Sequence, residues 1–211
     1  MLQDKRDRQT IKLWKDKLAP KVAEIQEALR QLAPEDIARR SGTKLQDGRL
    51  CVHMLFQPYM VDAQTFEVYK ANGETVPSFF QSLVLTYLQT ADGVGLAERW
   101  ISFRELPDGA FYHRAFQGYA PNRLTKRWPM DVDGFATACR ALGGMRLNLG
   151  DAGFVLRVLP RVDMAAVYWL GDQDFPSRAS ILFDANAYHY MVTDGLAILG
   201  NMLVSKILSA N

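Results

Sequence analysis

The sequence lacks long hydrophobic runs and has little cysteine. Its two cysteines, Cys51 and Cys139, form no CxxC pair. A disulfide framework, a zinc site and a built-in iron–sulfur cluster are therefore not expected. The longest apolar runs, such as Ala165 to Leu170, are far shorter than the ~20 residues of a membrane-spanning helix, and the start, MLQDKRDRQT, has no apolar core of a signal peptide. We expect a cytoplasmic protein with no membrane partner.

The motifs of several large enzyme classes are also missing. The sequence contains no HExxH, GxSxG, GxGxxG, GKS or GKT. Zinc proteolysis, serine hydrolysis, dinucleotide binding and P-loop chemistry therefore lack their usual sequence support. Charge is nearly balanced, with 25 basic and 23 acidic residues and a net charge of +2. Such a balance gives no strong field toward nucleic acid, which is not expected as a partner.

The composition is that of a folded globular protein. The hydrophobic share of 48% and the charged share of 23% suit a chain of 211 residues with one hydrophobic core. We expect two parts: a helical N-terminal segment, residues 1–40, packed on a single α+β domain, residues 41–211. Helical spacing in the first part is shown by Leu18, Val22, Ile25, Leu29 and Leu32, with Pro20 expected between two helices. These helices are also a candidate docking arm for a protein partner.

Hydrophobic patterns in the second part predict both strands and helices. Extended segments are expected at 50–56, 60–69, 100–106, 154–159 and 164–170, and helices at 34–41, 77–90, 131–142 and 193–208. The run 165–170 is apolar throughout, as expected of a central strand buried on both faces. The predicted fold class is α+β, with one mixed or mainly antiparallel sheet packed with helices and with helical N- and C-termini.

The stretch Trp100 to Leu124 (WISFRELPDGAFYHRAFQGYAPNRL) combines aromatic rings and charges around two turn signals. Rings that exclude water and a few charges that orient a ligand are what a small-molecule pocket needs. The candidate ligand-binding residues are Trp100, Arg104, Glu105, Tyr112, His113, Tyr119 and Arg123. The alternative is structural: Arg104 and Glu105 form a partly buried ion pair and the rings fill the core. Adjacent charges on a strand point to opposite faces, which argues against their pairing with each other.

Three carboxylates in the stretch Trp169 to Asp184 are candidate metal ligands. Asp172 and Asp174 follow the apolar strand directly, and Asp184 follows a short apolar run. Carboxylate oxygens are suitable ligands for Mg²⁺ or Ca²⁺. Asp172 and Asp174 are also typical of a turn in which carboxylates accept hydrogen bonds from backbone N–H groups. The turn interpretation is favoured over the metal site. The alternative to metal binding for Asp184 is that it caps the segment Ala185 to Met191.

Several motifs occur in an order that resembles one family. They are Trp100 to Pro107, Gly109, Phe111-Tyr112, Ala115-Phe116, Leu142 to Gly144, Gly150-Asp151, Pro160-Arg161, Trp169 to Pro176 and Ile181 to Asp184. Over about residues 40 to 208 the chain is similar to a bacterial and archaeal family known as domain of unknown function 3786. The resemblance implies membership and no particular activity.

The resemblance also implies a metabolic setting. Members of that family occur mainly in anaerobic organisms, in a setting of corrinoid and one-carbon metabolism, and some have an N-terminal cysteine cluster. This sequence has charged residues in place of those cysteines, and Gln173 stands where the family commonly has glutamate. Both departures count against a metallocluster and against a metal site in the acidic loop.

Three hypotheses follow, and the first is favoured because no nucleophile motif is present. It is a binding or accessory protein, without catalysis of its own, that holds a small aromatic or tetrapyrrole-like ligand such as haem or a corrinoid. Arg104 and Arg123 would contact carboxylates of the ligand, and His113 would be an axial ligand.

The other two hypotheses use different residues. One is a divalent-metal-assisted enzyme in which Asp172, Asp174 and Asp184 hold the ion, and Glu105 or His113 moves protons. The other is a non-catalytic subunit of a protein complex, docked through the N-terminal helices.

Overall fold

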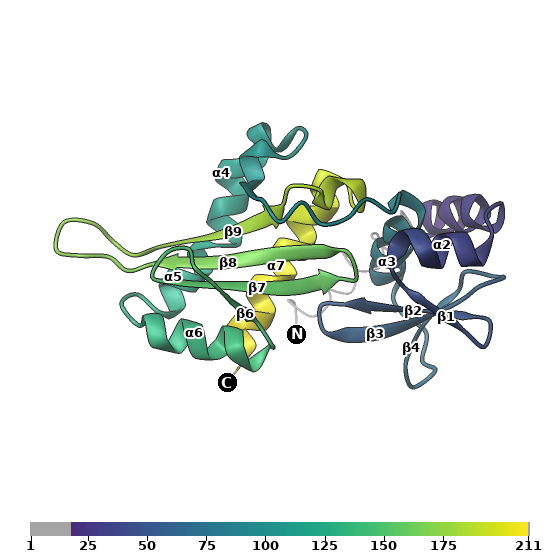
Figure 1. Ribbon diagram of the computed structural model, residues 1–211, viewed down its shortest axis with the longest axis horizontal. Helices are drawn as coiled ribbons and strands as arrows, with labels where there is room; N and C mark the ends of the chain where they lie inside the picture. The colour runs from purple at the N-terminus through teal and green to yellow at the C-terminus, as the bar shows by residue number, and fades with distance from the viewer. Residues whose placement is uncertain (1–17, 211) are drawn as a thin grey trace, which may run out of the picture. The chain divides into compact units, whose positions relative to one another are not determined.

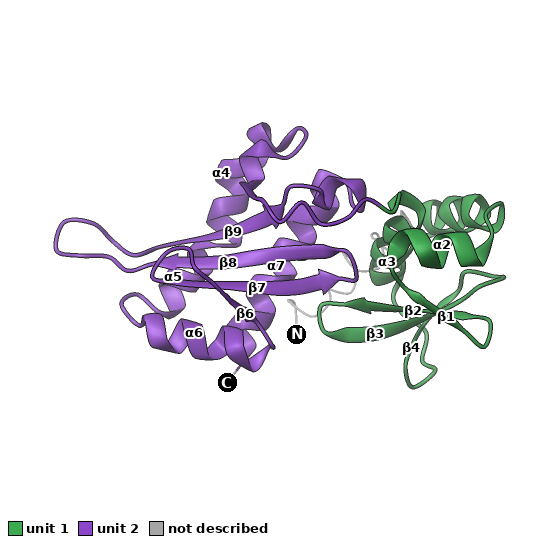
Figure 2. Ribbon diagram, in the orientation of Figure 1, with its two compact units in different colours: residues 1–93 green, residues 94–211 purple. Residues whose placement is uncertain are grey.

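A computed structural model of the chain describes residues 18–210, which fall into two compact units, Met1–Gly93 and Val94–Asn211 (Figure 2). The α+β class is as predicted. The expectation of one sheet is wrong, because the strands form two separate antiparallel sheets of four and five strands (Figure 1). Alternating hydrophobicity identifies a strand with a buried face but not the strand with which it pairs. The expected division at residue 40 stays a prediction.

The first unit begins with a helix over residues 18–30. Val22, Ile25 and Leu29 are buried on one face of this helix, as their spacing predicts. Pro20 lies in the first described turn of this helix, and the first of the two expected helices lies outside the described residues, so the expected boundary at Pro20 stays a prediction. Helix α2 (Pro34–Ser41) starts with proline and two acids and ends at Gly42, whose φ of 67° suits a glycine stop.

The sheet of the first unit is a meander of short strands. β1 (Lys44–Gln46), β2 (Arg49–Met54), β3 (Gln57–Asp62) and β4 (Val68–Lys70) pair in sequence order, and α3 (Ser78–Thr90) follows them. The β2–β3 turn uses Leu55 and Phe56, both with positive φ. Since neither is a glycine or asparagine, the turn has no sequence signal, and β2 ends at Met54, two residues before the end of the expected strand 50–56.

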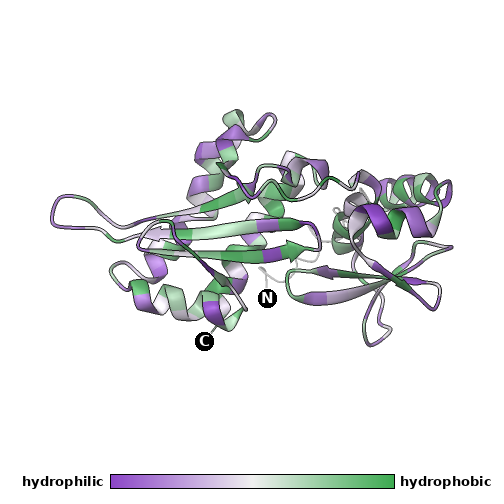
Figure 3. Cartoon of the chain, viewed as in Figure 1, coloured by the Kyte–Doolittle hydropathy of each residue, from purple (hydrophilic) through white to green (hydrophobic). Residues whose placement is uncertain are grey.

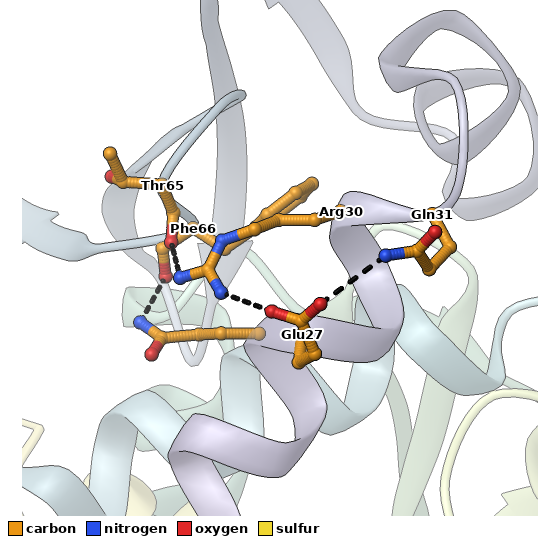
Figure 4. Close-up of polar contacts among 6 residues, drawn as sticks. Glu27, Arg30, Gln31, Thr65 and Phe66 are labelled. Carbon is orange, nitrogen blue, oxygen red and sulfur yellow. Dashed lines mark hydrogen bonds and ion pairs between the residues drawn. The ribbon is translucent and has the colours of Figure 1, made fainter.

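Polar contacts attach the helix of residues 18–30 to the β3–β4 connection (Figure 4). Arg30 donates to the Thr65 carbonyl at 3.2 Å, and Gln26 donates to the Phe66 carbonyl at 2.9 Å. Glu27 pairs with Arg30 at 2.7 Å and so orients the guanidinium. The N-terminal helix is therefore part of the first unit.

The second unit contains a five-stranded antiparallel sheet in the order β5-β9-β8-β7-β6. Its strands are β5 (Trp100–Ser102), β6 (Met145–Leu147), β7 (Ala152–Leu159), β8 (Val162–Trp169) and β9 (Arg178–Asp184). β8 is the middle strand and is buried from Val162 to Tyr168, which confirms the expected central strand up to Tyr168; Trp169 is half-buried, and Leu170 follows the strand and is 43% exposed. Figure 3 shows hydrophobic residues along most of β7 and β8 and a hydrophilic band near the turn that joins them.

Helices accompany this sheet. α5 (Asn122–Arg127) packs against β9, and α6 (Val132–Ala141) packs against β7 and β8. α7 (Thr193–Ser209) contacts α4 (Gly109–Tyr119), α5 and α6. Within residues 18–210 no helix has the length and apolar character needed to cross a membrane.

The segment 100–106 is extended only through Ser102. It then forms a single 3₁₀ turn, η1 (Phe103–Glu105), and a second such turn, η2 (Ala187–His189), precedes α7. Helices α4 and α5 were not predicted from the sequence. Glycine weakens a helix by about 1 kcal/mol relative to alanine, so Gly109 and Gly118 hide the pattern of α4. Tertiary packing compensates, because Phe116 of α4 stacks on Phe103 at 4.5 Å.

Candidate functional site

The two stretches that stand out in the sequence lie side by side in the second unit. β5 pairs antiparallel with β9, which places Trp100 opposite Asp184. At the other end of β9, Gln117 of α4 donates to the Ala179 carbonyl at 2.9 Å. The stretches 100–124 and 169–184 thus meet along the whole length of β9.

A groove of about 640 Å³ opens where α4 and α5 meet the start of β9; we name it the basic groove. It is lined by Gln117, Asn122, Thr125, Lys126, Trp169, Pro176, Ser177, Arg178, Ala179 and Ser180. The lining has two cations, one large ring and no carboxylate. Both stretches contribute to it.

Strand register and helix periodicity position the charged side of the basic groove. Trp169 and Arg178 are directly opposed in the β8–β9 ladder, and the guanidinium lies 5.7 Å from the centre of the indole. Asn122, Thr125 and Lys126 are three and four residues apart on α5 and so share one helix face. Gln117 donates to the Asn122 side chain at 2.9 Å, which holds both amides at the edge of the groove.

The loop of residues 170–177 forms one wall and is held by its own hydrogen bonds. Asp172 Oδ1 accepts from the backbone N–H groups of Asp174 and Phe175 at 2.9 and 2.8 Å. Ser177 Oγ accepts from the Gly171 N–H at 2.9 Å and donates to the Pro129 carbonyl. The carboxylate of Asp172 therefore has the turn role favoured for it from the sequence.

Asp184 lies at the far end of β9 from this loop. Six strand steps of about 3.3 Å separate the two ends, roughly 20 Å in all. Asp184 is buried and accepts from the N–H groups of Ala97 (3.0 Å), Glu98 (2.9 Å) and Asn186 (2.9 Å). The structure does not bring Asp184 to Asp172 and Asp174. In the described part of the chain, no group of three or more His, Cys, Asp or Glu is placed to hold a metal.

A second groove, of about 750 Å³, lies between the starts of α4 and α7; we name it the aromatic groove. It is lined by Pro107, Asp108, Phe111, Tyr112, Tyr188, Val192, Thr193 and Asp194. Of the seven predicted ligand-binding residues, Tyr112 lines the aromatic groove, and none lines the basic groove. Tyr119 is 45% exposed further along α4, and its ring meets Phe116 edge-on at 5.7 Å.

Three of the other predicted residues lie on β5 and η1. Trp100 is half-buried on β5, and Arg104 is exposed. The Glu105 carboxylate accepts from both the Ser102 hydroxyl and the Ser102 N–H at 2.7 Å, and these bonds lower the pKa of Glu105. The alternative interpretation expected an ion pair between Arg104 and Glu105. No such ion pair is present among the described residues.

The last two predicted residues make contacts within the fold. His113 Nδ1 lies 2.8 Å from the Ala110 carbonyl of its own helix. Arg123 donates to Asn201 at 2.8 Å and to Ser205 at 3.1 Å, and so ties α5 to α7. Neither lines the basic groove or the aromatic groove. Binding roles for these residues stay predictions.

Sequence reasoning passed over the two cations of the basic groove. Neither Lys126 nor Arg178 was a site residue predicted from the sequence. The signal for Lys126 is its spacing from Asn122 and Thr125, which becomes visible once α5 is known to be a helix. The signal for Arg178 is its position relative to Trp169. The two residues flank the 170–177 loop symmetrically, so a hairpin of β8 and β9 places them opposite each other.

Comparison with known proteins gives one match. No curated protein and no solved structure shows significant similarity to the chain. The model of a family described as "Domain of unknown function (DUF3786)" matches residues 33–206, most of the chain and all nine strands. The chain therefore belongs to the DUF3786 family.

Proposed function

We propose that the chain is a binding or accessory protein, without catalysis of its own, whose ligand lies in the basic groove. The ligand is a small aromatic or tetrapyrrole-like molecule that carries carboxylates, as haem and corrinoid acids do. The observation that carries this proposal is the convergence of both informative stretches on one groove with a tryptophan, two cations and no carboxylate.

Size and shape support a small-molecule ligand. The volume of about 640 Å³ falls within the ~300–1,000 Å³ of small-molecule sites. Trp169 and Pro176 give the groove an apolar surface against which a flat ring can pack. Hydroxyl and amide groups of the lining, such as those of Asn122 and Ser180, are available to orient polar substituents.

The cations suit a ligand with acidic substituents. Arg178 stacks on Trp169, so the guanidinium is oriented before a ligand arrives, and Lys126 stands on the facing helix. Hydrogen bonds between such cations and a carboxylate are about twice as strong as neutral ones. The absence of acids from the lining means that no internal carboxylate competes for these cations.

The same lining favours binding over catalysis. It contains no histidine and no carboxylate to serve as a general base, and the Ser177 hydroxyl is already bonded to the Pro129 carbonyl. The metal-enzyme hypothesis is disfavoured because the length of β9 separates Asp184 from Asp172 and Asp174.

Absorption titration tests the proposal. Haem, a corrinoid and flavin mononucleotide are each titrated with the full chain at micromolar concentration, and at least one should show a shifted band. Reversal of both cations, Lys126→Glu with Arg178→Glu, should weaken that binding at least tenfold, since each charged bond contributes about 1.5–3 kcal/mol. Arg104→Glu, an exposed cation outside the groove, is the matched control and should have no effect. No shift with any of the three ligands, or equal loss in the control, would overturn the proposal.

A further inference from the structure

Helix α4 (labelled in Figure 1) carries an exposed apolar stripe. Phe111 is 86% exposed, Tyr112 64% and Tyr119 45%, and Ala115 and Gly118 are exposed between them. At 100° per residue these five positions cover an arc of about 120°. We call them the α4 stripe. Phe116, about 100° from the middle of the stripe on the helical projection, is buried against Phe103 and Phe183.

The α4 stripe continues into the aromatic groove. Tyr188 is 43% exposed and Val192 58% exposed, and both line that groove together with Phe111 and Tyr112. A ring of about 200 Å² gives the four exposed aromatic side chains roughly 480 Å² in total. This is within the ~300–600 Å² of the largest, often functional, patch on a monomer, and more than half of the ~800 Å² that each partner contributes to a stable interface.

Two small residues of the stripe permit close approach: Ala115 at its middle and Gly118 at the edge nearest Arg114. A Cβ added at Gly118 would meet nothing within 4 Å, so the backbone is open to a partner there. Ala115 lies one turn earlier on the same face. Aromatic side chains therefore lie on both sides of Ala115, and the open backbone at Gly118 extends the surface onto which another helix can pack.

Charges of opposite sign border the two sides of the stripe. Arg114 is exposed on one flank of α4, 60° from Phe111 on the helical projection. Asp108 and Asp194 lie on the other flank, where they line the aromatic groove beside Tyr112. The pKa of Tyr119 is raised, first by burial and then by the nearby charge of Asp194, which places that carboxylate on the Tyr119 side as well.

We propose that the α4 stripe is the interface for a second copy of this chain, with a two-fold axis that runs along α4. Such an axis sets the two helices parallel and brings Arg114 of each copy opposite Asp108 and Asp194 of the other. Antiparallel helices would set Arg114 against Arg114 across the same face. A partner of a single charge sign would be repelled by one flank or the other, whereas a second copy complements both.

Sedimentation equilibrium of the full chain from about 1 to 200 µM tests the proposal, and a monomer–dimer equilibrium is expected in this range. Phe111→Asp should raise the dissociation constant at least 100-fold, because a charge would enter the centre of the interface. Phe175→Asp is the matched control: Phe175 is 70% exposed but lies in the 170–177 loop outside the stripe, and its substitution should change the constant less than threefold. Circular dichroism of both variants checks that they are folded.

Charge reversal tests the orientation of the two copies. Arg114→Glu and Asp194→Lys should each raise the dissociation constant about tenfold, and the double variant should return it to within threefold of the wild type. A chain that is monomeric at 200 µM, or a dimer that survives Phe111→Asp, would overturn the interface. Additive losses in the double variant would overturn the parallel arrangement. Variants of the basic groove leave this equilibrium unchanged, so the two proposals fail separately.

Discussion

Asp184→Asn is expected to destabilise the second unit strongly, although it replaces one side chain by another of nearly the same shape. Both oxygens of Asp184 are in use: Oδ1 accepts from Ala97 and Asn186, and Oδ2 accepts from Glu98. An asparagine supplies one acceptor oxygen and one NH₂ group. Whichever way the amide is turned, at least one backbone N–H faces another donor in a buried position.

The magnitude follows from the hydrogen bonds that change. A buried N–H left without an acceptor costs about 1–3 kcal/mol, and two bonds that pass from a charged to a neutral acceptor lose about 1 kcal/mol each. Relief from the desolvation of a buried charge offsets part of this loss. We expect the free energy of unfolding to fall by roughly 2–4 kcal/mol, measured by urea denaturation at pH 7.

Asp172→Asn is the matched control. Both of its bonds reach the same oxygen, Oδ1, so an asparagine can keep them, and Asp172 is exposed. The free energy of unfolding of Asp172→Asn should fall by less than about 0.5 kcal/mol, as for surface substitutions in general. If Asp184 were chiefly a metal ligand, Asp184→Asn would remove carboxylate charge without loss of stability. A measured change below about 0.5 kcal/mol for Asp184→Asn would therefore refute the structural reasoning.

Three further predictions concern the thiols, a pH effect and a glycine. Burial raises the pKa of Cys139 to about 12. A thiol reagent at pH 8 should therefore label the half-buried Cys51 first and Cys139 only after denaturation. Rapid labelling of both cysteines in the folded protein would contradict this. Ser102→Ala should cost about 1 kcal/mol, the usual value of a lost cap. The pKa of Glu105 is lowered on folding, so the difference in free energy of unfolding between the wild type and Ser102→Ala should be complete above about pH 4.5 and should shrink as the pH falls below it. Urea denaturation of both proteins at pH 3.5 and 7 checks this. Gly171→Ala would place a Cβ 2.5 Å from backbone atoms of the 170–177 loop. This substitution should destabilise the second unit by about 1–3 kcal/mol and weaken ligand binding in the basic groove. Unchanged absorption titrations would count against this loop as a wall of the groove.

Several elements could be predicted from the sequence because local chemistry and packing agree there. α6 has an aspartate at its start, whose side chain accepts from the Gly134 N–H at 2.8 Å, and it is followed by Gly143 with a φ of 76°. The apolar run of β8 is buried because that strand is central. In both cases the same residues satisfy local and tertiary requirements, so the pattern suffices.

Other elements depend on contacts that no local pattern records. α4 forms despite two glycines because Phe116 packs between Phe103 and Phe183. The division into two sheets depends on which strands pair, which the alternation of apolar residues leaves open.

The location of the candidate site could be predicted better than its residues. Aromatic and charge density indicated both stretches, and the structure brings them together on β9. The individual side chains were misplaced because the segment after Ser102 turns into η1 and α4 instead of continuing as a strand. That change of period redirects the side chains of Arg104 and Glu105, and α4 and α5 had no predicted helical pattern from which to place the residues from Tyr112 to Arg123.

The hydrogen bonds of the 170–177 loop have a consequence for how fast and how tightly a ligand can bind. A wall that had to be ordered on binding would lose conformational entropy, about 1–2 kcal/mol for each backbone residue fixed. Here Asp172 and Ser177 have already fixed the loop against its own backbone and against the Pro129 carbonyl. A ligand that enters the basic groove therefore meets a finished surface. Its association rate should depend on diffusion and on ionic strength, with no slow conformational phase.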